Sequence, residues 1–222
     1  MTLKLVVFDV DGTLVDSQGD ILASMQIAFD GVGLPLPDRA AVLSIVGLSL
    51  PQAMARLVPG ASDAKIDALV TGYKDGYFER RKISGHAPLY PGITDLLTAL
   101  GKYDNLLLGI ATGKSRRGLD ALLEGLNLPV RFVTTQVSDD HPSKPHPAML
   151  HAALRESGVD AADSVMIGDT SYDMDMAQSA GMKSIAVGWG YHDDAALSGA
   201  NTLVHDAEAL QQAIYQQLGD LG

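Results

Sequence analysis

Short apolar runs that end at polar residues or glycine recur along the chain. The first covers residues 3–8 and stops at Asp9. A continuous apolar run of this length, rich in Val, is typical of a strand buried on both faces of a parallel sheet. Similar runs predict five further strands, at residues 106–111, 131–133, 165–167, 184–187 and 202–204.

Between the later strands, apolar residues recur at helical spacing. Ile93, Leu96, Leu97 and Leu100 fall on one helix face, and two further segments, beginning near residues 116 and 148, repeat the pattern. Strands that alternate with helices in this way form right-handed βαβ units around a parallel sheet. The sequence therefore predicts an α/β fold with a Rossmann-like parallel sheet core.

Residues 16–84 interrupt this alternation because no strand is predicted there. One apolar stripe runs from Ile21 to Val32 and a second from Ile66 to Phe78, with Ser62 as the expected N-cap of the second helix. Gly72 and Gly76 in that helix suggest a close helix crossing. With two shorter helices near 38–45 and 51–57, this stretch predicts a small helical-bundle cap domain. The core domain would be residues 1–15 and 85–222, with hinges at 12–16 and 84–91.

Composition excludes several classes of function. The chain of 222 residues has no cysteine, which excludes disulfides, thiolate nucleophiles and cysteine-bound zinc. It carries 16 Lys and Arg against 27 Asp and Glu, so we expect no nucleic-acid partner, which would need a basic face. No apolar run approaches the ~20 residues of a membrane span, and the N-terminal run is too short for a signal peptide. We therefore expect a cytoplasmic protein with no membrane partner.

Polar residues gather where the predicted strands end. Because ligands of open parallel sheets bind beyond the carboxyl ends of the strands, these residues are expected to share one site. Two carboxylates two residues apart in a turn repel one another unless a cation joins them, and all-oxygen ligands suit Mg²⁺. We therefore predict Mg²⁺ as cofactor. The residues at this edge are Asp9, Asp11, Thr112, Gly113, Lys114, Asp139, Asp140, Lys144, Asp169 and Asp173.

Other motifs have simpler interpretations. Residues 109–115 almost spell a phosphate-binding P-loop, but three residues separate the glycines where that motif needs four. Lys114 is accordingly interpreted as a solvated lysine, with a neighbour of the bound phosphate as the alternative. Tyr73, Tyr77 and Phe78 are interpreted as part of the apolar core of the cap.

Four segments together resemble the motifs of the haloacid dehalogenase superfamily, small helical cap subclass. They are Asp-Val-Asp-Gly-Thr-Leu-Val-Asp-Ser at 9–17, the strand ending in Thr112, Lys144 within Ser-Lys-Pro-His-Pro, and Gly-Asp-Thr-Ser-Tyr-Asp at 168–173. Residues 89–92 and 188–191 are similar to the subgroup of phosphoglycolate-phosphatase-like hydrolases. The resemblance covers nearly the whole chain.

This resemblance implies a Mg²⁺-dependent phosphomonoester hydrolase that acts on a small phosphorylated metabolite, with 2-phosphoglycolate as one candidate. Asp9 would be the nucleophile that forms an aspartyl-phosphate, and Asp11 the general acid and base. The metal ligands would be Asp9, Asp169 and the backbone carbonyl of Asp11. The remaining roles would be phosphate binding by Thr112 and Gly113, charge compensation by Lys144, and orientation of Lys144 or a metal-bound water by Asp173.

The loop at residues 46–50, between the two short cap helices, is the expected specificity loop. Gly47, Leu48 and Ser49 would face the nucleophile, and Ser49 can cap the following helix. A plain turn between helices is the alternative interpretation. Because the loop lacks Arg and Lys, it could not hold a second phosphate, and we expect little mutase activity.

Two other functions are compatible with parts of this pattern. A sugar-phosphate mutase of the same superfamily uses the same four motifs. A receiver-like signalling domain also phosphorylates an Asp beside Mg²⁺, but such modules have about half this length and no inserted helical domain.

Overall fold

The sheet of this computed structural model, which describes residues 2–219, has six parallel strands in the order β3-β2-β1-β4-β5-β6. The α/β fold with a parallel sheet is thereby confirmed. The domain limits proposed at residues 1 and 222 lie outside the described residues. The strands are β1 (Lys4–Phe8), β2 (Leu106–Thr112), β3 (Thr134–Val137), β4 (Ser164–Gly168), β5 (Lys183–Val187) and β6 (Thr202–Val204).

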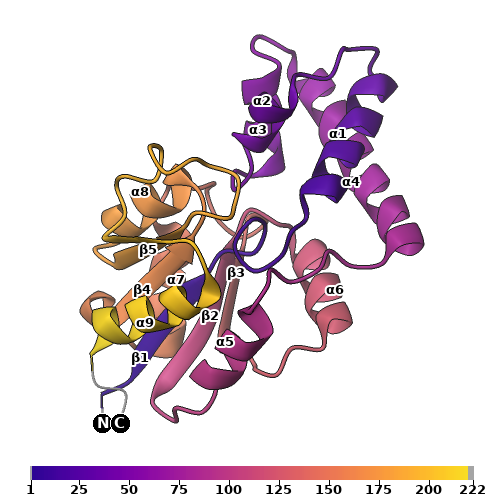
Figure 1. Cartoon of the computed structure of the whole chain (residues 1–222). Coiled ribbons are helices and arrows are strands. Elements are labelled where there is room, and N and C mark those ends of the chain that lie inside the picture. Colours follow the sequence, from indigo (N-terminus) through magenta and orange to yellow (C-terminus); the bar gives the residue numbers. More distant parts are fainter. Residues whose placement is uncertain (1, 220–222) are drawn as a thin grey trace.

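Alternating residues of β1 face opposite sides of the sheet, and both sides are covered by helices (Figure 1). Val6 and Phe8 pack with apolar residues of α5, α6 and α9, whereas Leu5 and Val7 pack with α7 and α8. Burial on both faces explains why the strand is apolar throughout. These helices are α5 (Ile93–Leu100), α6 (Arg116–Leu126), α7 (Ala148–Ser157), α8 (Ser171–Ser179) and α9 (Ala207–Leu218).

The central strand β1 and its two neighbours, β2 and β4, are in register near their carboxyl ends. Phe8 is paired with Ile110 of β2 and with Ile167 of β4. The residues that follow these three strands therefore emerge at one edge of the sheet, and this register brings the first, second and fourth motifs together.

The strand predicted at residues 131–133 is wrong, because β3 begins at Thr134. Val133 is half exposed, whereas Thr134 and Gln136 are buried. Both polar side chains donate hydrogen bonds to the Glu156 carboxylate, at 2.6 and 2.8 Å. Partners on a neighbouring helix thus satisfy these side chains, and a search for apolar runs misses a strand of this kind.

Four helices lie between β1 and α5 and pack around an apolar cluster of their own. Figure 1 shows them grouped apart from the sheet, at the upper right. The close helix crossing expected from Gly72 is present, because a Cβ on that residue would lie 3.1 Å from the Ala28 Cα in α1. The helices are α1 (Gln18–Gly31), α2 (Arg39–Leu43), α3 (Leu50–Leu57) and α4 (Asp63–Ser84).

Two helices of this group begin where the sequence predicts, but the predicted capping hydrogen bonds are not formed. Ser49 and Ser62 occupy the N-cap positions of α3 and α4, but neither side chain accepts a capping hydrogen bond. Asp38 caps α2 through Ala41 N. Among the described residues, no helix combines the length and apolar character needed to span a bilayer.

Candidate active site

The loop after β1 folds tightly back on itself. The amides of Leu14 and Val15 both donate to the Val10 carbonyl, at 2.9 and 3.0 Å. Gly12 has a φ of +83°, and a Cβ there would lie 2.1 Å from the Asp169 Oδ2. Glycine is therefore required both by the backbone conformation and by the close approach of that carboxylate.

Three buried carboxylates meet at the carboxyl edge of the sheet. Oxygens of Asp9, Asp169 and Asp173 all lie within 4.8 Å of one another. Lys144, which is fully buried, places its Nζ 2.9 Å from Asp9 Oδ1 and 2.7 Å from Asp173 Oδ1. One ammonium group thus faces three carboxylates, and the cluster carries an excess of negative charge.

Burial and mutual repulsion shift the pKa values of this cluster. Burial raises the pKa of Asp9 to about 7, because the opposing effect of Lys144 only partly offsets burial and the nearby Asp173 charge. Burial, followed by the charges of Asp9 and Asp173, raises the pKa of Asp169 well above its usual range. Burial alone would lower the pKa of Lys144, but the Asp173 and Asp9 carboxylates outweigh it and raise that pKa.

These residues fit a hard divalent cation. The only described donor group close to the buried Asp9 carboxylate is the Lys144 ammonium, 2.9 Å from Oδ1. A buried carboxylate with so few partners is costly, and a cation bound by oxygen ligands would reduce that cost. The donor set and the small number of partners at Asp9 therefore suit Mg²⁺.

Neighbouring donors hold two of the three carboxylates. Asp169 accepts hydrogen bonds from Thr13 Oγ1 and from the Tyr191 amide, both at 2.9 Å. Asp173 accepts from the amide and the hydroxyl of Thr170 in the capping box that begins α8. The fourth motif thereby fixes Asp173 through the start of α8, whereas Asp169 is held by donors from two other loops.

The side chain of Asp11 lies outside this cluster and faces Lys114. Lys114 Nζ is 2.8 Å from each Asp11 oxygen and 3.2 Å from the Tyr77 hydroxyl, and Ser17 Oγ also donates to Asp11. The interpretation of Lys114 as solvated is wrong, since only 8% of its side chain is exposed. Tyr77 likewise reaches beyond the cap core. Together, Asp11 and Lys114 form a nearly buried ion pair between the sheet edge and α4.

Thr112 and Gly113 lie at the end of β2. Thr112 is buried and its hydroxyl accepts from the Lys114 amide at 3.2 Å, while Ser115 is the residue that caps α6. A Cβ on Gly113 would lie 2.7 Å from the Gly47 carbonyl oxygen. The absence of a side chain at Gly113 therefore lets the loop at residues 46–50 pack directly against the end of β2.

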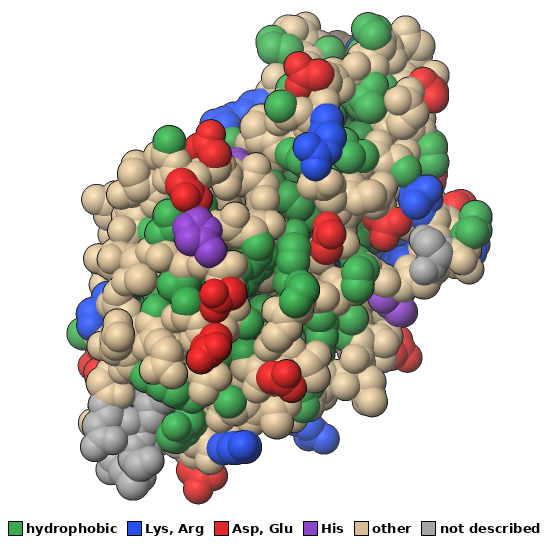
Figure 2. Space-filling view, in the orientation of Figure 1, with side chains coloured by type: hydrophobic (Ala, Val, Ile, Leu, Met, Phe, Trp, Pro, Cys, Tyr) green, Lys and Arg blue, Asp and Glu red, His purple; other side chains and the backbone are tan. Residues whose placement is uncertain are grey.

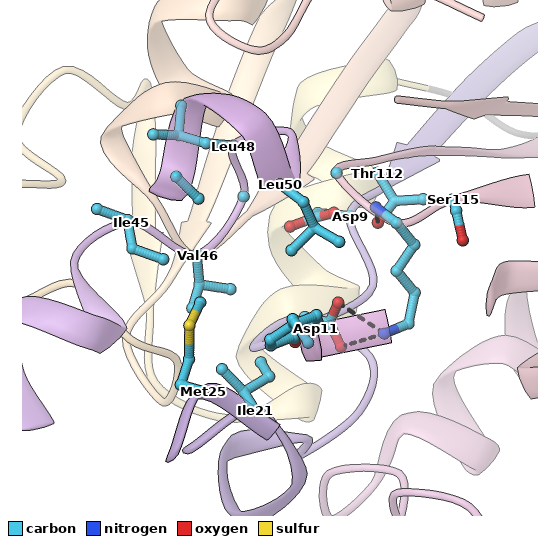
Figure 3. Close-up of a pocket in the computed structure, with 15 residues that line it drawn as sticks. Asp9, Asp11, Ile21, Met25, Ile45, Val46, Leu48, Leu50, Thr112 and Ser115 are labelled. Carbon is cyan, nitrogen blue, oxygen red and sulfur yellow. Dashed lines mark hydrogen bonds and ion pairs between the residues drawn. The ribbon is translucent and has the colours of Figure 1, made fainter. Parts of the chain in front are cut away.

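A cavity of about 70 Å³ lies between that loop and the sheet edge. Figure 3 shows Ile21, Met25 and Val46 along one side, with Asp9 and Thr112 across from them. Gly47 and Leu48 line the same cavity. Ser49 does not, because its amide instead donates to Ser143 Oγ at 2.8 Å, beside Lys144.

Several residues of this site escape sequence reasoning. Thr13 and Ser17 lie within the first motif and Ser143 within the third. Their position inside these motifs is the only feature of the sequence that indicates a role in the site. Tyr191 follows a glycine, Gly190, at which a Cβ would lie 2.2 Å from the Asp169 Cβ. The requirement for glycine at that position becomes visible only once the fold brings the loop to Asp169.

The geometry of this site agrees with what comparisons with known proteins show. A family model described as haloacid dehalogenase-like hydrolase matches residues 6–187. The chain belongs to this family. The expected resemblance and the expected enzyme class, a phosphatase, are both confirmed.

Individual relatives cover most of the chain. A protein of Dickeya dadantii named "Probable phosphatase IndB" is 36% identical over 90% of this chain and 87% of its own length. A phosphoglycolate phosphatase of Mesorhizobium japonicum is 32% identical, over 87% of this chain and 86% of its own. The crystal structure of a hydrolase from Pseudomonas syringae superposes with a TM-score of 0.84 at 25% identity, covering 97% of this chain and 99% of that one.

Proposed function

We propose that this chain is a Mg²⁺-dependent phosphomonoesterase that hydrolyses a small phosphorylated metabolite in the cytoplasm through an aspartyl-phosphate on Asp9. One observation carries the proposal. The buried Asp9 carboxylate lines a cavity, has the buried Lys144 ammonium as its only close described donor, and lies within 4.8 Å of two further carboxylates.

The chemistry begins at Asp9. A carboxylate oxygen of Asp9 attacks phosphorus, the bond between phosphorus and the leaving oxygen breaks, and Asp11 gives that oxygen its proton. In the second half of the reaction Asp11 takes a proton from a water molecule, whose oxygen attacks phosphorus and restores the Asp9 carboxylate. In this conformation Lys114 and Ser17 hold the Asp11 side chain at the cavity wall, so Asp11 must leave its ion pair with Lys114 to act as the proton donor.

Other residues bind the phosphoryl group and compensate charge. Thr112 and the amide of Gly113 would hold phosphate oxygens, and Lys144 would offset the charge on Asp9 and the phosphoryl group. Asp173 is a positioning residue, because it holds Lys144 through a 2.7 Å ion pair. Mg²⁺, held by Asp9, Asp169 and the Asp11 carbonyl, would supply the positive charge that draws a phosphate dianion to an acidic site.

We propose that residues 16–84 act as a cap over a core formed by residues 1–15 and 85–222. The loop with Gly47, Leu48 and Ser49 limits the space around the leaving group and excludes water. The phosphoglycolate phosphatase among the relatives makes 2-phosphoglycolate one candidate substrate.

Neither alternative function is favoured. The relatives reported above do not support a mutase, since they are named as a probable phosphatase and a phosphoglycolate phosphatase, and residues 46–50 offer no cationic side chain to hold a second phosphate at that loop. A receiver domain is not supported either, because the family match to a hydrolase spans residues 6–187.

A panel of phosphorylated metabolites assayed with Mg²⁺ and ranked by kcat/KM tests the proposal. We expect hydrolysis of at least one small monophosphate by the wild type and none above background by Asp9→Asn. Equal rates for the two proteins would refute it.

A further inference from the structure

The cavity at Asp9 is too small for most leaving groups. Its volume of about 70 Å³ compares with roughly 300–1,000 Å³ for typical ligand sites. The phosphoryl group itself must occupy much of this space, since it has to reach Asp9. In this conformation, any sizeable leaving group must therefore extend into a neighbouring space.

A second cavity, of about 350 Å³, adjoins the first between α4 and α6. Lys114 and Ser115 line both cavities, so the Lys114 side chain forms part of the wall between them. Tyr77, whose hydroxyl accepts a hydrogen bond from Lys114, lines the second cavity as well. The two spaces are therefore adjacent, and the ion pair of Asp11 and Lys114 stands at their boundary.

The second cavity is cationic in a chain whose net charge is −11. Lys74, Arg81 and Arg117 line it, and none of them forms an ion pair with a described carboxylate. Two acids, Asp75 and Asp139, also line it, but Asp139 accepts a hydrogen bond from the Arg116 amide at the start of α6. Cationic side chains thus outnumber acids here, whereas acidic side chains are scattered over the face seen in Figure 2.

Neither aromatic side chain in this cavity is free to stack on a ligand, since Tyr77 has Lys114 Nζ 4.9 Å from its ring centroid. Phe78 already has Lys82 Nζ 4.3 Å and Arg117 Cζ 4.5 Å from its ring centroid. These contacts favour an anionic ligand over a planar aromatic one, because the ring helps to hold the cations in place.

We propose that the cavity between α4 and α6 is a subsite for a second anionic group on the leaving group of the substrate, a carboxylate or a second phosphate. Lys74 and Arg117 bind that group while the scissile phosphate lies at Asp9. This inference rests on the proposed function and narrows the substrate class to phosphomonoesters that carry a second negative charge.

The test uses pairs of phosphomonoesters of increasing chain length that differ only in a terminal carboxylate, beginning with 2-phosphoglycolate and ethyl phosphate. Their binding to the Asp9→Asn protein with Mg²⁺ is measured by calorimetry, and their turnover by the wild type is measured in parallel. We expect the carboxylated member to bind more tightly, with a preference that grows with chain length. Adding Lys74→Gln and Arg117→Gln should reduce that preference at least about tenfold, the loss expected for one charge-assisted contact. Bisphosphorylated chains in a parallel series distinguish phosphate from carboxylate as the preferred group.

The matched control is Lys65→Gln with Arg155→Gln, which removes the same charge from exposed positions on α4 and α7 away from the cavity. It should leave the preference unchanged. The subsite would be overturned if the preference for the carboxylated member of each pair stayed within twofold of its original value after Lys74→Gln and Arg117→Gln. It would also be overturned if that preference were greatest for 2-phosphoglycolate and did not respond to these substitutions. Failure of turnover on every substrate would instead refute the proposed function, because the binding preference is measured without catalysis.

Discussion

At the scale of single residues, the site separates its acids by environment. Asp9 lies beside Lys144 in the buried cluster, whereas Asp11, only two residues away, pairs with Lys114 and Ser17. Neighbouring residues in the sequence thereby face different partners and can perform different steps of one reaction.

The two acids should respond differently to amide substitution. Asp9→Asn should abolish the phosphoenzyme, whereas Asp11→Asn keeps the nucleophile and loses the proton donor. We expect Asp11→Asn to reduce kcat/KM at least about a hundredfold on alkyl phosphates and clearly less on aryl phosphates, whose leaving groups need little protonation. Acid-quenched protein analysed by mass spectrometry should carry a phosphoryl group on the peptide with Asp9. Equal losses on both substrate classes would contradict the role of Asp11.

Mg²⁺ affinity should depend more on Asp169 than on Asp173. The Asp173 oxygens are engaged by Lys144 and by both donors of Thr170, so its contribution is mainly to position Lys144. We expect the shift of the unfolding midpoint produced by Mg²⁺ to be lost in Asp169→Asn and only reduced in Asp173→Asn. A titration of each variant with Mg²⁺ checks this order, and the reverse order would refute the assignment of ligands.

At the scale of elements, the loop between α2 and α3 connects the helices α1–α4 to the candidate site. Its backbone packs on Gly113, and its Ser49 amide binds Ser143 beside Lys144. Gly47 is a poor position for a probe, because its φ of +97° strains any other residue. Leu50, the first residue of α3, lines the cavity and lies close to Asp9 in Figure 3.

Leu50→Ala should enlarge the space around the leaving group. We expect kcat/KM for a bulky phosphomonoester to rise several-fold relative to a small one, in line with about 1–3 kcal/mol for a small change of apolar volume. Gln52→Ala is the matched control, because this exposed residue lies on the same helix and does not line the cavity. An unchanged substrate ranking in Leu50→Ala would show that the loop does not control specificity.

How much of this could be predicted from the sequence depends on the kind of residue. Apolar strands such as β1 and glycines in tight motifs such as Gly12 carry local signals, which sufficed for the sheet and for the acids at its edge. The strand β3 has buried polar residues whose partner, Glu156, lies on another element. The burial of Lys114 cannot be predicted from local sequence for the same reason, since its partners Asp11 and Tyr77 are distant in the sequence. Local patterns reveal burial and turns, but not pairings between distant side chains.

At the scale of the whole molecule, the proposed function assigns the chemistry to one part of the chain and control of access to another. The carboxyl edge of the sheet brings together Asp9, Thr112 and Asp169 from three strands. The helices α1–α4 pack around an apolar cluster that also includes Tyr172 of α8, and α1, α3 and α4 contribute side chains to the cavity wall. Changes in α1–α4 should therefore alter substrate selection, while changes at the sheet edge should remove the reaction itself.

The excess of carboxylates over cations should make the whole protein depend on metal for stability. Without a divalent cation, the repulsion among Asp9, Asp169 and Asp173 is only partly offset by Lys144. We expect Mg²⁺ to raise the unfolding midpoint of the wild type, as any ligand of the folded state does. Lys144→Met should unfold at a lower temperature in chelator and regain part of that loss with Mg²⁺. A midpoint in Lys144→Met that matches the wild type in chelator would contradict this account of the cluster.

The most direct test of the central claim is hydrolysis of a small phosphomonoester before and after removal of divalent metal. The account predicts that the wild type is active with Mg²⁺, loses that activity in chelator, and recovers it when Mg²⁺ is restored, because an acidic site cannot otherwise hold a phosphate dianion. Asp9→Asn should stay inactive under all three conditions. Full turnover by the wild type in chelator, or turnover by Asp9→Asn at the wild-type rate, would contradict it.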